Sequence, residues 1–173
     1  MSEYNTRPDK TLAAVCGLFC PSCTIYIASH SDPERLENLA ERFGLPPEEL
    51  MCDGCRSERR IYFCREHCKM TKCAAERGID FCGQCEEFPC DELSEFQSKM
   101  PHRIELWNSH SRINEAGWET WYGEMLKEYS CGCGTINSAY DFECRKCGTE
   151  PSCAYVKKHR DEIEKGTDRL KQK

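Results

Sequence analysis

Cysteine pairs separated by two residues recur along this chain, and their spacing is that of metal ligands. They are Cys20/Cys23, Cys52/Cys55, Cys82/Cys85 and Cys144/Cys147, among sixteen cysteines in 173 residues. Two intervening residues allow one tight turn to direct both sulfurs at a tetrahedral ion, and two such turns complete a four-sulfur site. One pair would be weak evidence, but four pairs in so small a chain predict bound metal.

Most of the predicted ligands lie in the N-terminal half. They are Cys16, Cys20, Cys23, Cys52, Cys55, Cys64, Cys68, Cys73, Cys82, Cys85 and Cys90. Two four-cysteine sites leave three of these thiols over, and three sites lack one ligand, a place that His67 or His30 could fill. A four-sulfur site is most simply completed by two cysteine turns. This favours one site that joins Cys20/Cys23 to Cys52/Cys55, and another that joins Cys82/Cys85 to two of Cys68, Cys73 and Cys90. The spacing leaves other groupings open.

A second constellation lies near the C-terminus. Cys131-x-Cys133-x10-Cys144-x2-Cys147 has the count and span of a zinc ribbon or small finger. Asn137, between the two pairs, is expected to hydrogen-bond the backbone of the turn, as asparagine commonly does. The sequence therefore predicts these four cysteines as the ligands of one zinc ion, with Cys153 as a spare thiol.

The N-terminal half resembles the mainly prokaryotic domain-of-unknown-function family 3795. The resemblance lies in Cys16-Gly-Leu-Phe-Cys20-Pro-Ser-Cys23, Ile25-Tyr-Ile-Ala28, Cys52-Asp-Gly-Cys55, Cys68-Lys-Met-Thr-Lys-Cys73-Ala and Cys82-Gly-Gln-Cys85-Glu-Glu-Phe-Pro-Cys90. These motifs occur in order over about half of the chain. Cys64-x3-Cys68 departs from the family's more usual two-residue spacing, which puts the role of Cys64 in question. The resemblance implies a small metal-binding domain and brings no established reaction.

The C-terminal constellation is similar to the zinc finger of the Ran-binding-protein type. Tyr129 stands where that family has tryptophan, and Asn137 and Cys144 have the family's spacing. The single residue between Cys131 and Cys133 departs from the family's two to four. Fingers of that type bind single-stranded RNA or ubiquitin, and Arg145 and Lys146 are the candidate RNA contacts that the resemblance implies.

The composition limits which cellular compartment and which classes of partner are expected. The polar first ten residues lack the apolar core of a signal peptide, and no run approaches the length of a membrane span, so we expect a reducing cytoplasm in which thiols bind metal rather than pair. Without its cysteines the chain has few apolar residues, so its hydrophobic core is expected to be small. Zinc bound at structural sites could supply the missing folding free energy. A formal net charge of −6 disfavours generic phosphate binding, and the basic segments 56–72 and 156–173 are expected to be solvated surfaces.

The elements between the cysteines are predicted to be helices within a small α+β, metal-stabilised fold. Helices are expected over 33–43, 68–77 and 91–100, with an aromatic amphipathic helix over 113–129 whose stripe is core, and a frayed helix in the tail from Lys157. The predicted units are a cysteine-rich metal-binding domain at 12–92, a helical connector at 93–128, a zinc finger or ribbon at 129–153 and a charged tail at 154–173.

Catalytic signatures are missing from the sequence, which contains no GxxxxGK[ST], GxSxG, GxGxxG or HExxH. Cys16-x3-Cys20-x2-Cys23 has the spacing of a radical S-adenosylmethionine cluster, but the chain is too short for the accompanying barrel. We therefore expect two to three or more zinc ions in a protein-interaction or adaptor module rather than an enzyme. The alternatives are an iron–sulfur protein in electron transfer or redox sensing, and a single-stranded RNA-binding protein.

Overall fold

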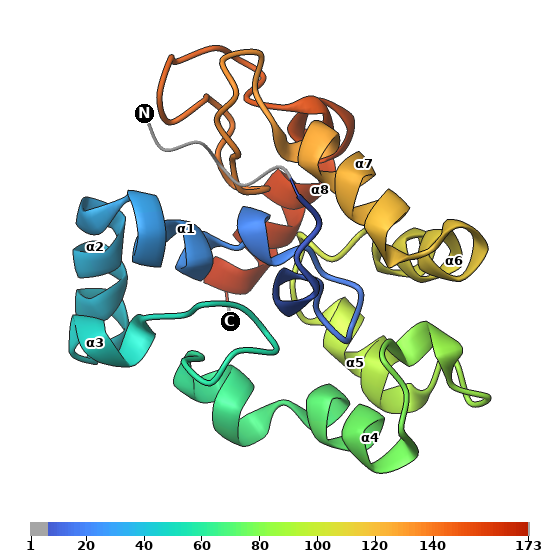
Figure 1. Cartoon of the computed structure of the whole chain (residues 1–173). Coiled ribbons are helices and arrows are strands. Elements are labelled where there is room, and N and C mark those ends of the chain that lie inside the picture. Colours follow the sequence, from blue (N-terminus) through green and yellow to red (C-terminus); the bar gives the residue numbers. More distant parts are fainter. Residues whose placement is uncertain (1–6, 173) are drawn as a thin grey trace.

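The fold is helical, with loops and short turns between the helices (Figure 1). The structure is a computed structural model that describes residues 7–172; the start of the polar N-terminal segment and Lys173, at the end of the predicted tail, lie outside it. Within residues 7–172 there is no strand, only the isolated antiparallel bridges Ala13–Phe19 and Ser130–Ile136. The predicted α+β class and the ribbon are thus not confirmed, because each bridge closes a single cysteine loop and does not extend into a ladder.

Eight α-helices account for most of the regular structure in the described part of the chain. They are α1 (Thr24–Ser31), α2 (Pro33–Phe43), α3 (Pro47–Leu50), α4 (Lys69–Arg77), α5 (Asp91–Ser98), α6 (Leu106–Ala116), α7 (Trp118–Tyr129) and α8 (Ala154–Lys171). Single turns of tighter or wider helix are η1 (Lys10–Leu12), η2 (Cys20–Ser22), η3 (Phe63–His67) and η4 (Cys82–Gln84). In Figure 1, α2 and α3 lie at the left of the molecule, α4 lies at the bottom near α5, and α7 lies at the upper right beside the C-terminal loops. No helix in residues 7–172 is long and apolar enough to cross a bilayer.

The predicted helices of the N-terminal half are confirmed with their boundaries nearly unchanged. The Asp32 carboxylate accepts the backbone N–H of Arg35, which caps α2, and Pro33 occupies its first turn. Gly44 ends α2 in the left-handed conformation at a φ of 64°. Gly78 ends α4 in the same way, so the terminators read from the sequence act as expected.

The predicted single helix over 113–129 is wrong in its length and continuity. Gly117 has a φ of 84° and a ψ of 155°, which no helix can contain, so α6 ends at Ala116 and α7 begins at Trp118. The predicted frayed tail is instead an ordered helix from Ala154. Val156 and Ile163 on that helix are fully buried, which explains its order.

Two apolar clusters support the molecule. The first contains the aromatic stripe, since Ile113, Trp121, Tyr122 and Tyr129 pack with Phe19, Phe81 and the buried face of α8, confirming its assignment to the core. The second is smaller and lies in the N-terminal half, where the Cys16 and Cys68 side chains are buried beside Met70, Leu93 and Leu106. Its core is thus made partly of thiols, whereas the first is made mainly of rings.

Candidate metal centre

Four sulfurs converge near the C-terminus, in residues 129–153, which we call the finger. The Sγ atoms of Cys131, Cys133, Cys144 and Cys147 all lie within 4.8 Å of one another. Cys131 Sγ is 3.6 Å from Cys147 Sγ, and Cys133 Sγ is 3.7 Å from Cys144 Sγ. Four sulfurs bound at about 2.3 Å to a tetrahedral zinc lie about 3.8 Å apart. This group could therefore hold a metal ion with little rearrangement.

The first two of these thiols are set by a tight backbone loop. Ser130 and Ile136 pair at its base, and the N–H of Cys131 donates to the carbonyl of Thr135 at 2.9 Å. At its tip, the N–H of Gly134 donates to the carbonyl of Cys131 at 2.9 Å, and Gly134 has a φ of 84°. A glycine is needed at this position because side chains disfavour positive φ. The loop thereby directs two thiols to the same side.

Asn137 is the centre of the finger's hydrogen bonding and is completely buried. Its amide nitrogen donates to the Thr135 carbonyl at 3.1 Å and to Cys144 Sγ at 3.6 Å, and its amide oxygen accepts the N–H of Arg145 at 3.2 Å. The expected contact with the backbone is present, together with a hydrogen bond to the sulfur of Cys144, a predicted ligand, which sequence reasoning missed. Such contacts orient metal ligands from outside the coordination sphere.

Local donors stabilise thiolates in the finger. The side chain and the backbone N–H of Thr135 lower the pKa of Cys133 to about 6, and the Thr135 hydroxyl lies 3.3 Å from its sulfur. Burial opposes ionisation of Cys144, but the backbone N–H groups of Cys147 and Lys146 and the Asn137 amide outweigh it and lower its pKa. The backbone N–H of Cys133 favours ionisation of Cys131, but burial and the neighbouring thiols outweigh it and raise the pKa of Cys131 to about 11. Thiolates are the metal-binding form of cysteine, so Cys133 and Cys144 are prepared for a cation.

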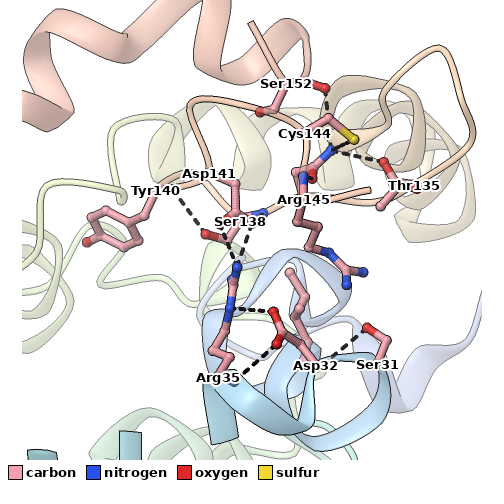
Figure 2. Close-up of polar contacts among 12 residues, drawn as sticks. Ser31, Asp32, Arg35, Thr135, Ser138, Tyr140, Asp141, Cys144, Arg145 and Ser152 are labelled. Atoms are coloured by element: carbon pink, nitrogen blue, oxygen red, sulfur yellow. Dashed lines mark hydrogen bonds and ion pairs between the residues drawn. The ribbon is translucent and has the colours of Figure 1, made fainter. Parts of the chain in front are cut away.

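An ion pair connects the finger to α2, as Figure 2 shows. The Arg35 guanidinium donates to the two carboxylate oxygens of Asp141 at 2.8 and 3.3 Å, and its Nε lies 2.9 Å from Asp32. Asp141 also accepts the N–H of Ser138 at 2.8 Å. The Asp141 carboxylate therefore has two roles: it orders the loop between the two cysteine pairs, and it contacts the N-terminal half.

The eleven N-terminal cysteines, in the unit predicted at 12–92, are arranged differently. Cys16, Cys52 and Cys68 are buried, Cys23 and Cys73 are exposed, and Cys20, Cys55, Cys64, Cys82, Cys85 and Cys90 are partly buried. In the part of the chain that the structure describes, the four finger cysteines are the only group of three or more cysteine, histidine or carboxylate side chains that lie close enough together to bind one metal ion. The structure thus brings the N-terminal thiols into one region without assembling a complete ligand set, and their grouping stays a prediction.

Burial makes several of the N-terminal thiols resist ionisation. Burial, the largest cause, and the neighbouring thiols together raise the pKa of Cys64 and of Cys82 to about 12. The thiols that influence one another form two neighbourhoods, Cys20, Cys23, Cys52, Cys55 and Cys64 in one and Cys73, Cys82, Cys85 and Cys90 in the other, with Cys16 and Cys68 close to both. A bound dication would relieve this repulsion.

The loop around Cys16 repeats the backbone geometry of the finger loop. Ala13 pairs with Phe19, the N–H of Ala14 donates to the Leu18 carbonyl at 3.0 Å, and the N–H of Gly17 donates to the Ala14 carbonyl at 2.9 Å. Gly17 has a φ of 82°, close to the 84° of Gly134. Cys16 therefore occupies the position of Cys133, while Ala14 stands where the finger has Cys131.

The two histidines proposed as extra ligands, His30 and His67, contact other side chains or the backbone. His30 lies with Nδ1 2.9 Å from the Tyr26 carbonyl and Nε2 3.2 Å from Asp53, so both ring nitrogens have partners. His67 contacts the rings of Tyr62 and Phe63. The histidine that does meet cysteine segments is His110, on α6, which sequence reasoning overlooked; the glycines that follow Cys16 and Cys82 were the available signal, because they permit close approach.

The comparisons with known proteins agree with the N-terminal motifs. Residues 12–95 match the model of the family described as "Protein of unknown function (DUF3795)", which confirms the resemblance read from the sequence. The match contains all eleven N-terminal cysteines and ends before the finger. No curated protein and no solved structure matches the chain.

Proposed function

Because residues 12–95 belong to the DUF3795 family of proteins of unknown function, we propose a role from the chemistry of this chain: a zinc-binding protein that serves as a protein-interaction or adaptor module. The finger would hold one zinc ion. The N-terminal unit would hold one or two more, through thiols from its two neighbourhoods. A reducing, cytoplasmic setting would keep these thiols free, and all sixteen cysteines are unpaired in the structure.

The observation that carries the proposal is the separation of the four finger sulfurs. Distances of 3.6 and 3.7 Å between Sγ atoms match the edge of a tetrahedron around a single ion. The ligands of a polynuclear iron–sulfur cluster bind different irons, which requires more widely separated sulfurs. The geometry of the finger therefore favours one ion of the zinc type over a cluster. Iron–sulfur chemistry remains the alternative for the N-terminal thiols, whose all-sulfur composition suits either metal.

Protein recognition is favoured over RNA recognition by the side chains that the surface offers. Tyr129, at the position of the family tryptophan, is buried against Phe19 and Tyr155, and the Arg145 Nε donates to the Ile136 carbonyl. Neither side chain is thus presented as a stacking platform for bases. Large apolar side chains are exposed instead on the N-terminal unit, at Phe43 and Phe63 among others. Aromatic side chains supply much of the contact energy of protein interfaces, so exposed rings favour a protein partner.

Metal analysis of the full chain tests the proposal. Wild type purified without oxygen should contain two to three zinc ions and show no broad absorption near about 400 nm, the range expected for thiolate-bound iron clusters. Cys144→Ser should lose about one zinc ion, because it removes one of four ligands and the acceptor of the Asn137 amide.

Cys153→Ser is the matched control. Cys153 is a buried cysteine in the same region whose thiol lies outside the four-sulfur group. The control should keep the zinc content of wild type. Equal zinc loss in both variants would show that the ligand set is wrong, and iron with sulfide in wild type would replace zinc by the iron–sulfur alternative.

A further inference from the structure

His110 lies between two cysteine segments that are far apart in the sequence. It is completely buried, and its ring lies against Gly17 on one side and Gly83 on the other. A Cβ added to Gly17 would lie 2.9 Å from the His110 Nε2, and one added to Gly83 would lie 2.8 Å from the His110 Cβ. Both glycines are therefore required for the approach. Each directly follows a predicted ligand, Cys16 or Cys82.

Both nitrogens of the His110 ring are used, one for each segment. The backbone N–H of Gly83 donates to Nδ1 at 3.2 Å, so Nδ1 carries no proton. The proton of the neutral ring is then on Nε2, which donates to the carbonyl of Cys16 at 3.0 Å. A single side chain thus links the Cys16 loop to the Cys82–Gln84 turn, and its tautomer is fixed by the link.

Three further contacts surround this junction. The N–H of Cys82 donates directly to the Val15 carbonyl at 2.9 Å. Asn114, one helical turn after His110 on α6, donates to the Gly83 carbonyl at 2.7 Å. The ring of Phe88 packs on His110 with centroids 5.0 Å apart. The imidazole is therefore held rigidly at the junction.

We propose that His110 is a positioning residue that fixes the Cys16 loop relative to the Cys82–Gln84 turn, so that their thiols are presented to metal in one arrangement. The proposal rests on the proposed metal binding by the N-terminal unit. It extends that unit beyond the segment matched by the family model, because α6 begins at Leu106, after residue 95. The finger needs no such residue, since its ligands lie on one short segment.

Alkylation of individual cysteines in the zinc-loaded full chain, followed by peptide mass spectrometry, tests this role. His110→Phe keeps the ring shape and loses both hydrogen bonds. His110→Asn keeps an oxygen near the Nδ1 position, so it can still accept from Gly83, and is too short to reach the Cys16 carbonyl. Ile113→Ala is the control, because Ile113 is buried on the same helix and packs in the ring-rich cluster rather than against the cysteine segments.

Each lost neutral hydrogen bond should raise the alkylation rate of Cys16 and Cys82 about fivefold. His110→Phe should therefore have a larger effect than His110→Asn, and both should leave the finger cysteines at the wild-type rate. Ile113→Ala should accelerate alkylation in the finger as well, because it weakens the cluster that the finger shares. A His110→Phe variant that reacts like wild type, or that exposes finger and N-terminal thiols equally, would overturn the proposal.

A second measurement separates this proposal from the proposed function. If the wild-type N-terminal thiols react at the same rate with and without zinc, metal binding by that unit fails. Hydrogen exchange of the Gly83 amide in wild type and the two His110 variants then tests the role of His110 independently of metal binding. Protection that is lost in His110→Phe and kept in His110→Asn supports the junction, and equal exchange in wild type and both variants overturns it.

Discussion

The finger and the N-terminal unit use the same cysteine loop in two ways. In the finger, the loop closed by Ser130 and Ile136 carries two thiols, and the second pair begins at Cys144, with ten residues separating it from Cys133. In the N-terminal unit, the equivalent loop carries Cys16 alone, because Ala14 replaces the first cysteine. A loop with one thiol would need ligands from other turns to complete a four-sulfur site. The four finger thiols are thus brought together within one short segment, whereas a site in the N-terminal unit would depend on how separate segments pack.

The electrostatics of the two regions differ as well. Local hydrogen-bond donors lower the pKa of Cys133 and Cys144 in the finger, although that of Cys131 is raised. In the N-terminal unit, burial raises the pKa of Cys16, Cys20 and Cys55. Thiols that are buried together without a cation carry a large desolvation cost if they ionise. The N-terminal unit should consequently depend on its metal for stability more than the finger's surroundings do.

Metal removal should produce the largest difference between the two regions. A strong chelator is expected to unfold the N-terminal unit, whose small cluster contains Cys16 and Cys68, since a structural zinc contributes on the order of 10 kcal/mol. Helices α7 and α8 should remain, because Trp121, Tyr122 and Tyr155 form a core without metal. Hydrogen exchange with peptide resolution should show α4 losing protection while α7 keeps it.

Chelator saturated with zinc beforehand is the control for direct effects of the reagent. Equal loss of protection in α4 and α7 would mean that the two regions unfold as one unit. Full retention in both would mean that the thiols of the N-terminal unit have no structural metal. Either result would break the contrast between the N-terminal unit, which is expected to need metal, and helices α7 and α8, whose core is formed without it.

Local features of the fold were predictable from the sequence, because local signals set them. Asp32, Pro33 and Gly44 define α2 through capping and positive φ, and these effects involve only neighbouring residues. The convergence of the four finger cysteines was predictable for the same reason, since all four lie between residues 131 and 147. The interruption at Gly117 was missed because apolar periodicity continued across it, and an isolated glycine in such a pattern is often tolerated within a helix.

Long-range features were beyond the sequence. The position of His110 between Gly17 and Gly83 depends on how α6 packs on two loops, and no spacing rule connects residues so far apart. The charged composition of the tail likewise concealed that Val156 and Ile163 are buried against the ring-rich cluster. Grouping eleven thiols is a problem of the same kind, because each ligand set combines separate turns.

A histidine at the boundary between the regions should give a measurable pH dependence. His102 lies between α5 and α6, and its Nδ1 is 2.7 Å from the hydroxyl of Tyr140 in the finger. Burial, with a smaller effect of Arg103, lowers the pKa of His102 from 6.5 to about 4. The folded state therefore keeps this ring neutral at pH values where the unfolded chain protonates it. Its contribution to stability is complete above pH 6.5 and is lost as the pH falls towards 4.

Urea unfolding of wild type and His102→Asn at pH 7 and pH 5 measures this contribution. Wild type should lose about 2 kcal/mol more than the variant over this interval, because asparagine does not titrate. Both titrations are carried out with saturating zinc, so that zinc release contributes equally to the free energy of unfolding of the two proteins. Parallel pH dependence in wild type and variant would show that His102 is protonated equally in both states, and so is not desolvated at the boundary.

The Arg35–Asp141 ion pair should give the smallest effect and the most direct measure of contact between the regions. A double-mutant cycle with Arg35→Ala and Asp141→Asn should give a coupling of about 1 kcal/mol, since the pair is bidentate and mostly shielded from solvent. Asparagine at 141 still accepts the N–H of Ser138, so the finger loop keeps its internal hydrogen bond.

Arg112 and Glu124 provide the matched control, because this more exposed pair joins α6 to α7 without touching the N-terminal unit, and its coupling should be weaker. Unfolding free energies from urea titration supply all four corners of each cycle. A coupling near zero for Arg35 and Asp141 would mean that the finger and α2 are energetically independent despite their contact, whereas a coupling above that of the control pair identifies this carboxylate as a stabilising link between the two regions.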